Sequence, residues 1–239
     1  MTLALQSKQV EEIEKIIQQY KNIFGGKSMQ TNNYLPTGNK ALDDMLKGGY
    51  LKGTLTEISG VTDSGKTLLA LKAIKQVQQE NKLAVYINPS HNLNISMLID
   101  NDLDEEMISV LYMNAADKIG PLLSELKPCI NDIGIIVIDN LADLSTNKEQ
   151  DSPLKANTEI HRSKVIKALL TRLANLVRNT DTCVLIVNQE RVNFVDNEAQ
   201  GTVSSSERWI NLTCDTRIKL SIDDDGDSCV EIKFKERKL

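Results

Sequence analysis

Eight residues, Gly60 to Thr67, constrain the fold of this chain more than any other segment. They read G-V-T-D-S-G-K-T and match G-x-x-x-x-G-K-[ST], the pattern of a phosphate-binding loop. A strand-like run, Leu55 to Ile58, precedes them and a helical run, Leu68 to Gln78, follows. This strand–loop–helix order disfavours the alternative of a glycine-containing turn that fits by chance. We therefore expect the chain to bind a nucleoside triphosphate.

Each part of the motif has an expected role. The glycines let the backbone curl so that its N–H groups point at phosphate oxygens, and the following helix adds its positive N-terminal end. Lys66 is expected to reach the β- and γ-phosphates, and the Thr67 hydroxyl to ligate Mg²⁺. The expected nucleotide-binding residues are Gly60, Val61, Thr62, Asp63, Ser64, Gly65, Lys66, Thr67 and Leu68.

Composition places the chain among ordinary globular proteins. Its 239 residues can bury one sizeable core, and 41% are hydrophobic and 26% charged. No apolar stretch reaches transmembrane length, and the first residues are too short and uncharged for a secretory signal. Four scattered cysteines without a C-x-x-C pair fit a reducing cytosol, with Cys183 expected in the core. A net charge of −5 excludes a uniformly basic surface but not a local basic groove.

Apolar strand-like runs alternate with helical stretches along the chain. The expected strands are Leu83–Asn88, Ile108–Met113, Ile133–Asp139, Cys183–Asn188, Asp215–Ile222 and Cys229–Lys235. This alternation predicts an α/β fold, a P-loop NTPase core with a mostly parallel sheet flanked by helices. Gln9 to Ile23 is expected to form an amphipathic helix in an N-terminal arm, 1–34, before the core, 35–239. Asp223 to Asp227 is interpreted as a hairpin turn, with a calcium loop as the alternative.

Two further strand ends complete a nucleotide site. Ile135 to Asp139 is an apolar strand ending in a carboxylate, which can hold Mg²⁺ through water beside the phosphate loop. The strand Val184 to Val187 ends in Asn188 and Gln189, and a glutamine at that place can sense the γ-phosphate. A simple polar strand terminator is the alternative for Gln189.

The ordered set of motifs resembles the RecA family of recombinases. The resemblance is carried by four segments: Phe24-Gly25-Gly26-Lys27-Ser28-Met29, Leu35-Pro36-Thr37-Gly38 with Leu42-Asp43 and Gly48-Gly49, the phosphate loop, and Asp139 followed by Leu141-Ala142-Asp143-Leu144. The spacing from Asp139 to Gln189 and from Gln189 to Arg217 also fits the family without a gap. A phosphate loop alone occurs in many families, whereas this set is far more specific.

The resemblance implies ATP and Mg²⁺ as cofactors, with Asp139 at the metal site and Gln189 as γ-phosphate sensor. Single-stranded DNA is the implied partner, bound by two loops at about 147–160 and 190–206 along a filament axis. The residues implied in DNA binding are Lys164, Arg191, Arg162, Asn193, Phe194, Ser204 and Ser205. The N-terminal helix would contact a neighbouring protomer, the alternative being that its apolar face covers the chain's own core.

Several departures from the family pattern limit what the resemblance implies. Ser90 stands where the family has a catalytic glutamate, so hydrolysis is expected to be slow or to depend on another group, His91 being one candidate. Met97 takes the place of the aromatic residue that packs on adenine. The second loop carries acidic Asp196 and Glu198, and the family's C-terminal domain is expected to be missing, as in a phage or mobile-element recombinase.

Three functional hypotheses follow. The first is a cytoplasmic, ATP-dependent recombinase that polymerises on single-stranded DNA in recombination and repair, with a single-strand binding protein as a further partner and no membrane association. The second is a weakly hydrolysing paralogue that binds ATP and regulates a recombination or replication partner, which Ser90 favours. The third, a small-molecule kinase, is disfavoured because the chain lacks an evident lid and substrate-binding arginines.

Overall fold

The computed structural model describes residues 33–147, 149, 157–195, 198–222 and 228–235. The chain divides into two units, Met1–Asn33 and Tyr34–Leu239, and the fold given below is that of the second unit. The expected arm helix, Gln9–Ile23, lies outside the described residues, as does the acidic turn Asp223–Asp227.

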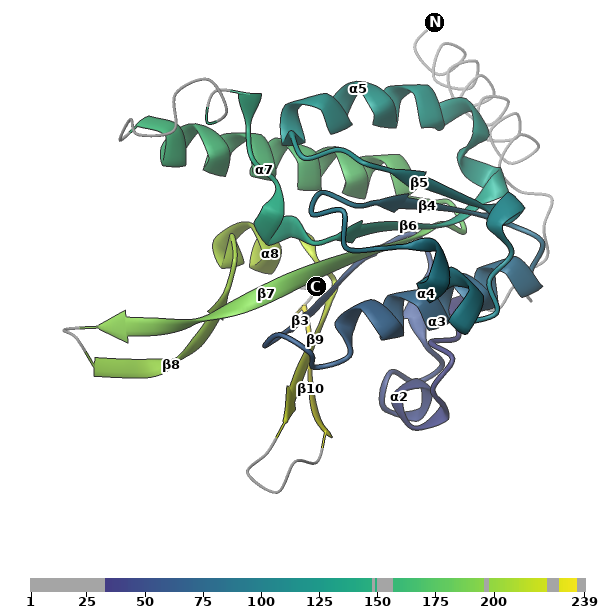
Figure 1. Cartoon of the computed structure of the whole chain (residues 1–239), viewed down its shortest axis with the longest axis horizontal. Coiled ribbons are helices and arrows are strands. Elements are labelled where there is room, and N and C mark those ends of the chain that lie inside the picture. The colour runs from purple at the N-terminus through teal and green to yellow at the C-terminus, as the bar shows by residue number, and fades with distance from the viewer. Residues whose placement is uncertain (1–32, 148, 150–156, 196–197, 223–227, 236–239) are drawn as a thin grey trace, which may run out of the picture. The chain divides into compact units, whose positions relative to one another are not determined.

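A mostly parallel β-sheet forms the centre of the fold, with the strand order β10-β9-β3-β7-β6-β4-β5 (Figure 1). Parallel pairing joins all neighbours from β9 to β5, whereas β10 runs antiparallel to β9 at one edge. The strands are β3 (Leu55–Gly60), β4 (Leu83–Ile87), β5 (Ile108–Leu111), β6 (Ile133–Asp139), β7 (Cys183–Val195), β9 (Thr216–Ile222) and β10 (Ser228–Phe234). A separate antiparallel pair comprises β1 (Tyr34–Leu35) and β2 (Tyr50–Leu51).

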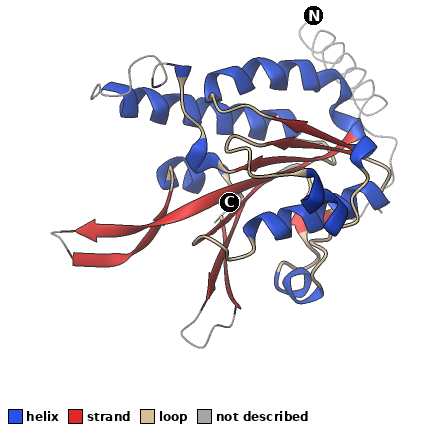
Figure 2. Cartoon of the chain, in the orientation of Figure 1, coloured by secondary structure: helices blue, strands red, loops and turns tan. Residues whose placement is uncertain are grey.

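Helices cover both faces of the sheet (Figure 2). On one face lie α3 (Lys66–Gln79) and α4 (Ile95–Asp100), with α2 (Lys40–Met45) beyond them, and on the other α5 (Ala116–Leu126) and α7 (Asn157–Val177). The shorter elements are α8 (Glu207–Thr213) and the 3₁₀ helices η1 (Glu105–Met107), η2 (Lys127–Asp132) and η3 (Leu141–Asp143). The expected α/β fold with a mostly parallel, helix-flanked sheet is confirmed.

Two apolar clusters, one on each face of the sheet, make up the core. Alternate residues of the central strands serve opposite faces: on β6, Ile135 and Val137 pack toward the α3 side, and Ile136 and Ile138 toward α5 and α7. Every residue of β6 is buried, which explains why its sequence is continuously apolar rather than alternating. Cys183, 1% exposed, lies in the α3-side cluster as expected, and burial raises the pKa of its thiol to about 12.

The chain after Gln189 forms strands where the resemblance implied a DNA-binding loop, at about 190–206. Strand β7 continues to Val195 and pairs antiparallel with β8 (Glu198–Ser204), so the two form a β-ribbon that extends beyond the rest of the sheet (Figure 1). The expected strand end at Asn188 is therefore wrong by several residues. Of the first expected loop, 147–160, the structure describes residues 147, 149 and 157–160, the last four within α7.

No helix among the described residues is long and apolar enough to span a bilayer.

Candidate nucleotide-binding site and its β-ribbon

The phosphate-binding motif forms the turn between β3 and α3. Gly60 closes β3 where the chain passes close to β9, because an added Cβ would meet the Leu220 carbonyl oxygen at 2.4 Å. Gly65 has a φ of 87°, in the left-handed region that favours glycine. Asp63 has a φ of 62°, also left-handed. The two glycines of the motif thus meet two separate demands, a close backbone approach and an unusual dihedral angle.

The first turn of α3 leaves its N–H groups facing the loop. The capping residue is Gly65, and no side chain caps the helix. In contrast, α2 and α4 are capped by Asn39 and Asn94, whose side-chain oxygens accept from the N–H groups of Leu42 and Met97. An uncapped N-terminus with its positive dipole end is suited to bind phosphate oxygens. Leu68, on the same turn, is 46% exposed.

Lys66 lies across the loop and is half-buried. Its Nζ donates to the carbonyl oxygen of Val61 and, at 3.4 Å, to Ser64 Oγ. Burial lowers the pKa of Lys66, although the nearby carboxylates of Asp139, Asp63 and Glu190 oppose that shift. A partly desolvated ammonium held over the loop is placed to exchange its carbonyl contact for a phosphate oxygen.

Asp139, at the end of β6, accepts two hydrogen bonds on one oxygen. Thr67 Oγ1 donates to Asp139 Oδ2 at 2.6 Å, and the Tyr86 hydroxyl donates to the same oxygen at 2.7 Å. Burial, followed by the charge of Asp139 and this hydrogen bond, raises the pKa of Tyr86. Sequence reasoning missed Tyr86 because its place in an apolar strand indicated a core residue only. Its buried hydroxyl holds the orientation of the Asp139 carboxylate through this hydrogen bond.

The pair Thr67 and Asp139 fits a magnesium ion. Mg²⁺ prefers oxygen ligands and is usually held by one or two protein groups together with substrate phosphates. A hydroxyl and a carboxylate already 2.6 Å apart beside the loop provide such a set. The described residues contain no group of three or more His, Cys, Asp or Glu side chains that could hold a metal without a ligand.

Gln189 connects β7 to the phosphate loop. In the parallel register Gln189 pairs with Gly60, and its Nε2 donates to Thr62 Oγ1 at 3.1 Å. The side chain expected to sense the γ-phosphate therefore already contacts the loop. Because the β-ribbon begins at the next residue, a movement of Gln189 would directly displace the base of the ribbon.

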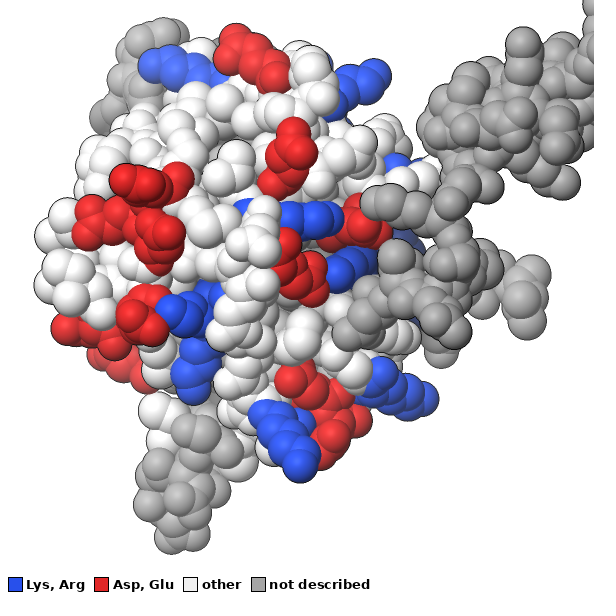
Figure 3. Space-filling model, turned by 90° about the vertical axis from the view of Figure 1, so that its right-hand side faces the viewer, with Lys and Arg blue, Asp and Glu red and all other residues white. Residues whose placement is uncertain are grey.

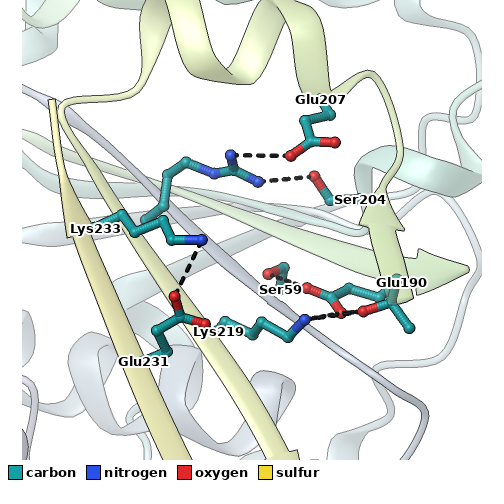
Figure 4. Close-up of a pocket in the computed structure, with 9 residues that line it drawn as sticks. Ser59, Glu190, Ser204, Glu207, Lys219, Glu231 and Lys233 are labelled. Carbon is teal, nitrogen blue, oxygen red and sulfur yellow. Dashed lines mark hydrogen bonds and ion pairs between the residues drawn. The ribbon is translucent and has the colours of Figure 1, made fainter. Parts of the chain in front are cut away.

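Glu190 fastens that base to the sheet (Figure 4). It accepts from Ser59 Oγ of β3 at 3.0 Å and from Thr202 Oγ1 of β8, and it pairs with Lys219 of β9 at 2.8 Å. Burial alone would raise the pKa of Glu190, but the hydrogen bonds from Lys219, Thr202 and Ser59 outweigh it and hold the pKa below its ordinary value.

A second ion-pair network lies beside the first. Glu57, which is fully buried on β3, accepts from Arg217 Nε at 2.6 Å, and Arg217 also reaches Glu207 at 3.3 Å and Ser204 at 3.2 Å. Ser204, 5% exposed, is thereby part of the ribbon base. The Ser205 carbonyl oxygen accepts from Asn188 Nδ2 at 2.8 Å. These contacts place Ser204 and Ser205 at the ribbon base, and their role in DNA binding stays a prediction.

Ser90, which departs from the family pattern, lies just after the end of β4, at what we call the β4 tip. Ser90 Oγ donates to Asp143 Oδ2 of η3. His91 stacks on Tyr112, with ring centroids 4.8 Å apart, and has a φ of 59°. Met97, on α4, packs partly buried against the core on the α3 side.

The basic residues predicted to bind DNA differ in their surroundings. Lys164, on α7, and Arg191, on the β-ribbon, are exposed. Arg162 instead turns back, donating to the carbonyl oxygens of Leu144 and Ala142 at 3.1 and 2.7 Å. Asn193 and Phe194 belong to β7, but their side chains lie outside the described part of the structure. The roles of these residues in DNA binding stay predictions.

Figure 3 shows the side of the core that is turned away from the ribbon. On the face turned away from the ribbon, acidic and basic side chains of the described residues are interspersed (Figure 3). A continuous basic surface for a nucleic acid backbone is absent from what that view shows of the described residues.

Comparison with known proteins decides the family. The family model described as RecA N-terminal domain matches residues 4–230. The chain belongs to the RecA family. This RecA-family chain is 26% identical over 219 residues to Protein RecA of Mycoplasma genitalium, covering 90% of this chain and 64% of the relative. It is 31% identical over 160 residues to Protein RecA of Aquifex aeolicus, covering 66% and 46%. The chain thus spans about half to two thirds of the length of these curated relatives.

Proposed function

We propose that this RecA-family chain binds ATP with Mg²⁺ and, in that state, binds single-stranded DNA as a recombinase filament in recombination and repair. The observation that carries the proposal is the continuous path from phosphate loop to ribbon. Gln189 touches the loop through Thr62, and the next residue, Glu190, is tied to the ribbon's second strand. A ligand at the loop can therefore bias the ribbon, which extends beyond the rest of the sheet.

Different residues of the chain bind the phosphates, the magnesium ion, the adenine base and the DNA. Lys66 and the uncapped start of α3 bind the phosphates, while Tyr86 and Thr67 orient the Asp139 carboxylate. Mg²⁺, when bound at Thr67 and Asp139, supplies positive charge that offsets the charge of the phosphates. Met97 offers apolar surface to the adenine base, and exposed Lys164 and Arg191 contact the DNA backbone. The protein acts in the cytoplasm and assembles with further copies of itself.

A weakly hydrolysing regulatory paralogue is the second candidate, and Ser90 is the observation that favours it. A serine hydroxyl is a poor general base at neutral pH, so a site that relied on Ser90 itself would bind ATP without turning it over rapidly. Such a protein would hold a recombination or replication partner, with a single-strand binding protein as one class of partner.

Electron microscopy and a binding titration test the proposal together. The protein is mixed with single-stranded DNA and a non-hydrolysable ATP analogue, and filaments with ATP-dependent DNA affinity are expected. Absence of DNA binding at low salt, with and without nucleotide, contradicts the recombinase and leaves the regulatory paralogue.

A further inference from the structure

The segments that follow β4 and β6 bring a carboxylate to the edge of the sheet beside the phosphate loop. The two strands are parallel neighbours, with Ile87 paired to Ile138, so the segments that follow them meet at one edge of the sheet. Asp139 of the same edge contacts Thr67 of the phosphate loop. Residues just beyond both strand ends therefore lie on the same edge of the sheet as the phosphate loop.

Two donors hold Asp143 at this edge. Ser90 Oγ and Asn140 Nδ2 both donate to Asp143 Oδ2, the latter at 2.8 Å. The Asp143 N–H in turn donates to Asn140 Oδ1 at 3.0 Å, which fixes the backbone of η3. Among the hydrogen bonds made by the described residues, none reaches Asp143 Oδ1, and the side chain is exposed. One carboxylate oxygen is thus anchored and the other faces solvent.

We propose that Asp143 is the general base for ATP hydrolysis in this chain, with Ser90 as its positioning residue. The inference rests on the proposed function, because it requires that ATP binds at the phosphate loop. A serine with a carboxylate hydrogen-bonded to it extends from the backbone about as far as a glutamate side chain. Ser90 and Asp143 together therefore present a carboxylate from the β4 tip, although neither residue does so alone.

The reaction step uses only ATP and water. The oxygen of a water molecule attacks the γ-phosphorus while one of its protons passes to Asp143 Oδ1. The bond between the γ-phosphorus and the oxygen bridging to the β-phosphate breaks, and its electron pair leaves with ADP. Inorganic phosphate and ADP are the products, and Asp143 then releases the proton to solvent. General-base assistance of this kind contributes ~10²–10⁴-fold to a rate.

The test measures phosphate release and nucleotide affinity in parallel on the full chain. In Asp143→Asn, ATP turnover with single-stranded DNA is expected to fall at least about tenfold, while affinity for a Mg²⁺-bound non-hydrolysable ATP analogue stays within about twofold. The matched control is Asp132→Asn, which removes an exposed carboxylate preceding β6, at the opposite end of the same strand, and leaves both quantities unchanged.

A rescue experiment separates catalysis from folding. Adding Ser90→Glu to Asp143→Asn returns a carboxylate to the same edge and is expected to restore turnover, a strongly non-additive pair. Ser90→Thr keeps the hydroxyl that positions Asp143 and retains turnover, whereas Ser90→Ala loses part of it. Asp143→Ser, a second removal of the carboxylate, must lose turnover as Asp143→Asn does.

The outcomes that overturn the inference are distinct from those that overturn the proposed function. Turnover unchanged in Asp143→Asn removes Asp143 from catalysis while the nucleotide site stands. Wild-type protein that binds the analogue but releases no phosphate has the same consequence and favours the regulatory paralogue. Failure of wild-type protein to bind the analogue contradicts the proposed function as well.

Discussion

The phosphate loop and the β-ribbon differ in how their residues are held, although they are neighbours. Around the loop, the groups suited to bind phosphate make few side-chain contacts: Lys66 donates to a backbone carbonyl oxygen, and no side chain caps the start of α3. At the ribbon base, buried charges are fully paired, with Glu190 bound from three strands. We therefore expect the loop to bind a ligand and the ribbon base to transmit the effect of that binding.

The largest expected effect is on ATP affinity and comes from replacing Lys66 of the phosphate loop. Lys66→Ala removes the ammonium that faces the β- and γ-phosphates, so affinity for ATP with Mg²⁺ should fall roughly tenfold or more. Isothermal titration measures it. The control is Lys72→Ala, an exposed lysine farther along α3 whose loss leaves the affinity unchanged. Equal affinities for all three proteins would show that the loop does not bind the nucleotide.

Asp139→Asn sharpens the description of the magnesium site. The substitution keeps an oxygen for the Thr67 and Tyr86 hydroxyls but removes the charge. Affinity for Mg²⁺-bound ATP should fall several-fold, while affinity for ATP in the presence of a metal chelator stays the same or rises, because a carboxylate no longer repels the phosphates. An equal loss with and without Mg²⁺ would place the defect outside the metal site.

A prediction of intermediate size concerns Arg191, the exposed basic residue of the ribbon. Arg191→Ala should weaken binding of single-stranded DNA several-fold and reduce the salt dependence of binding by about one counterion. Fluorescence titration at several salt concentrations measures both. Arg178→Ala, an exposed arginine just past the last turn of α7, is the control and should leave the slope unchanged. Equal effects of the two variants would mean that general charge, not the ribbon, attracts DNA.

The smallest expected effect lies at the ribbon base. The pKa of Glu190 is lower in the folded protein than its ordinary value of 4.5, which it has in the unfolded chain. The ion pair of Glu190 therefore stabilises the fold at pH values above 4.5, and this stabilisation is lost as the pH falls through the lower pKa of the folded protein. Glu190→Gln should lower the free energy of unfolding at pH 7 by about 1 kcal/mol and flatten its fall at acid pH. Denaturant unfolding at several pH values measures this.

The control at the ribbon base is Glu231→Gln, which breaks an exposed pair with Lys233. It should change stability little, because solvent screens exposed ion pairs. If Glu190→Gln behaved the same way, the base of the ribbon would not be held by its charges.

The sequence was sufficient to predict the structure of segments whose pattern is local. The phosphate loop, the buried strand before Asp139 and the alternation of strands and helices all follow from neighbouring residues, and the fold agrees. The ribbon was missed because 190–206 is polar and without an apolar run, so its strands depend on pairing with each other. The resemblance implied Arg162 in DNA binding, but the sequence cannot show that its guanidinium turns back to two carbonyl oxygens.

Contacts between segments that are distant in the chain could not be predicted from the sequence. Asp143 was noted only within a matching segment, and nothing local indicates that Ser90, 53 positions earlier, donates to it. Tyr86 is similar, since its hydroxyl gains a role only when β4 and β6 lie side by side. Such residues become visible when parallel strand ends are compared across the sheet.

The central claim, that the nucleotide at the loop controls DNA binding at the ribbon, is tested most directly by one titration. Labelled single-stranded DNA is titrated with wild-type protein at low salt, with and without a Mg²⁺-bound non-hydrolysable ATP analogue. The account predicts at least about tenfold tighter binding with the analogue, and loss of that gain in Gln189→Ala, which removes the contact with Thr62. Equal DNA affinity in the two nucleotide states of the wild-type protein would contradict it.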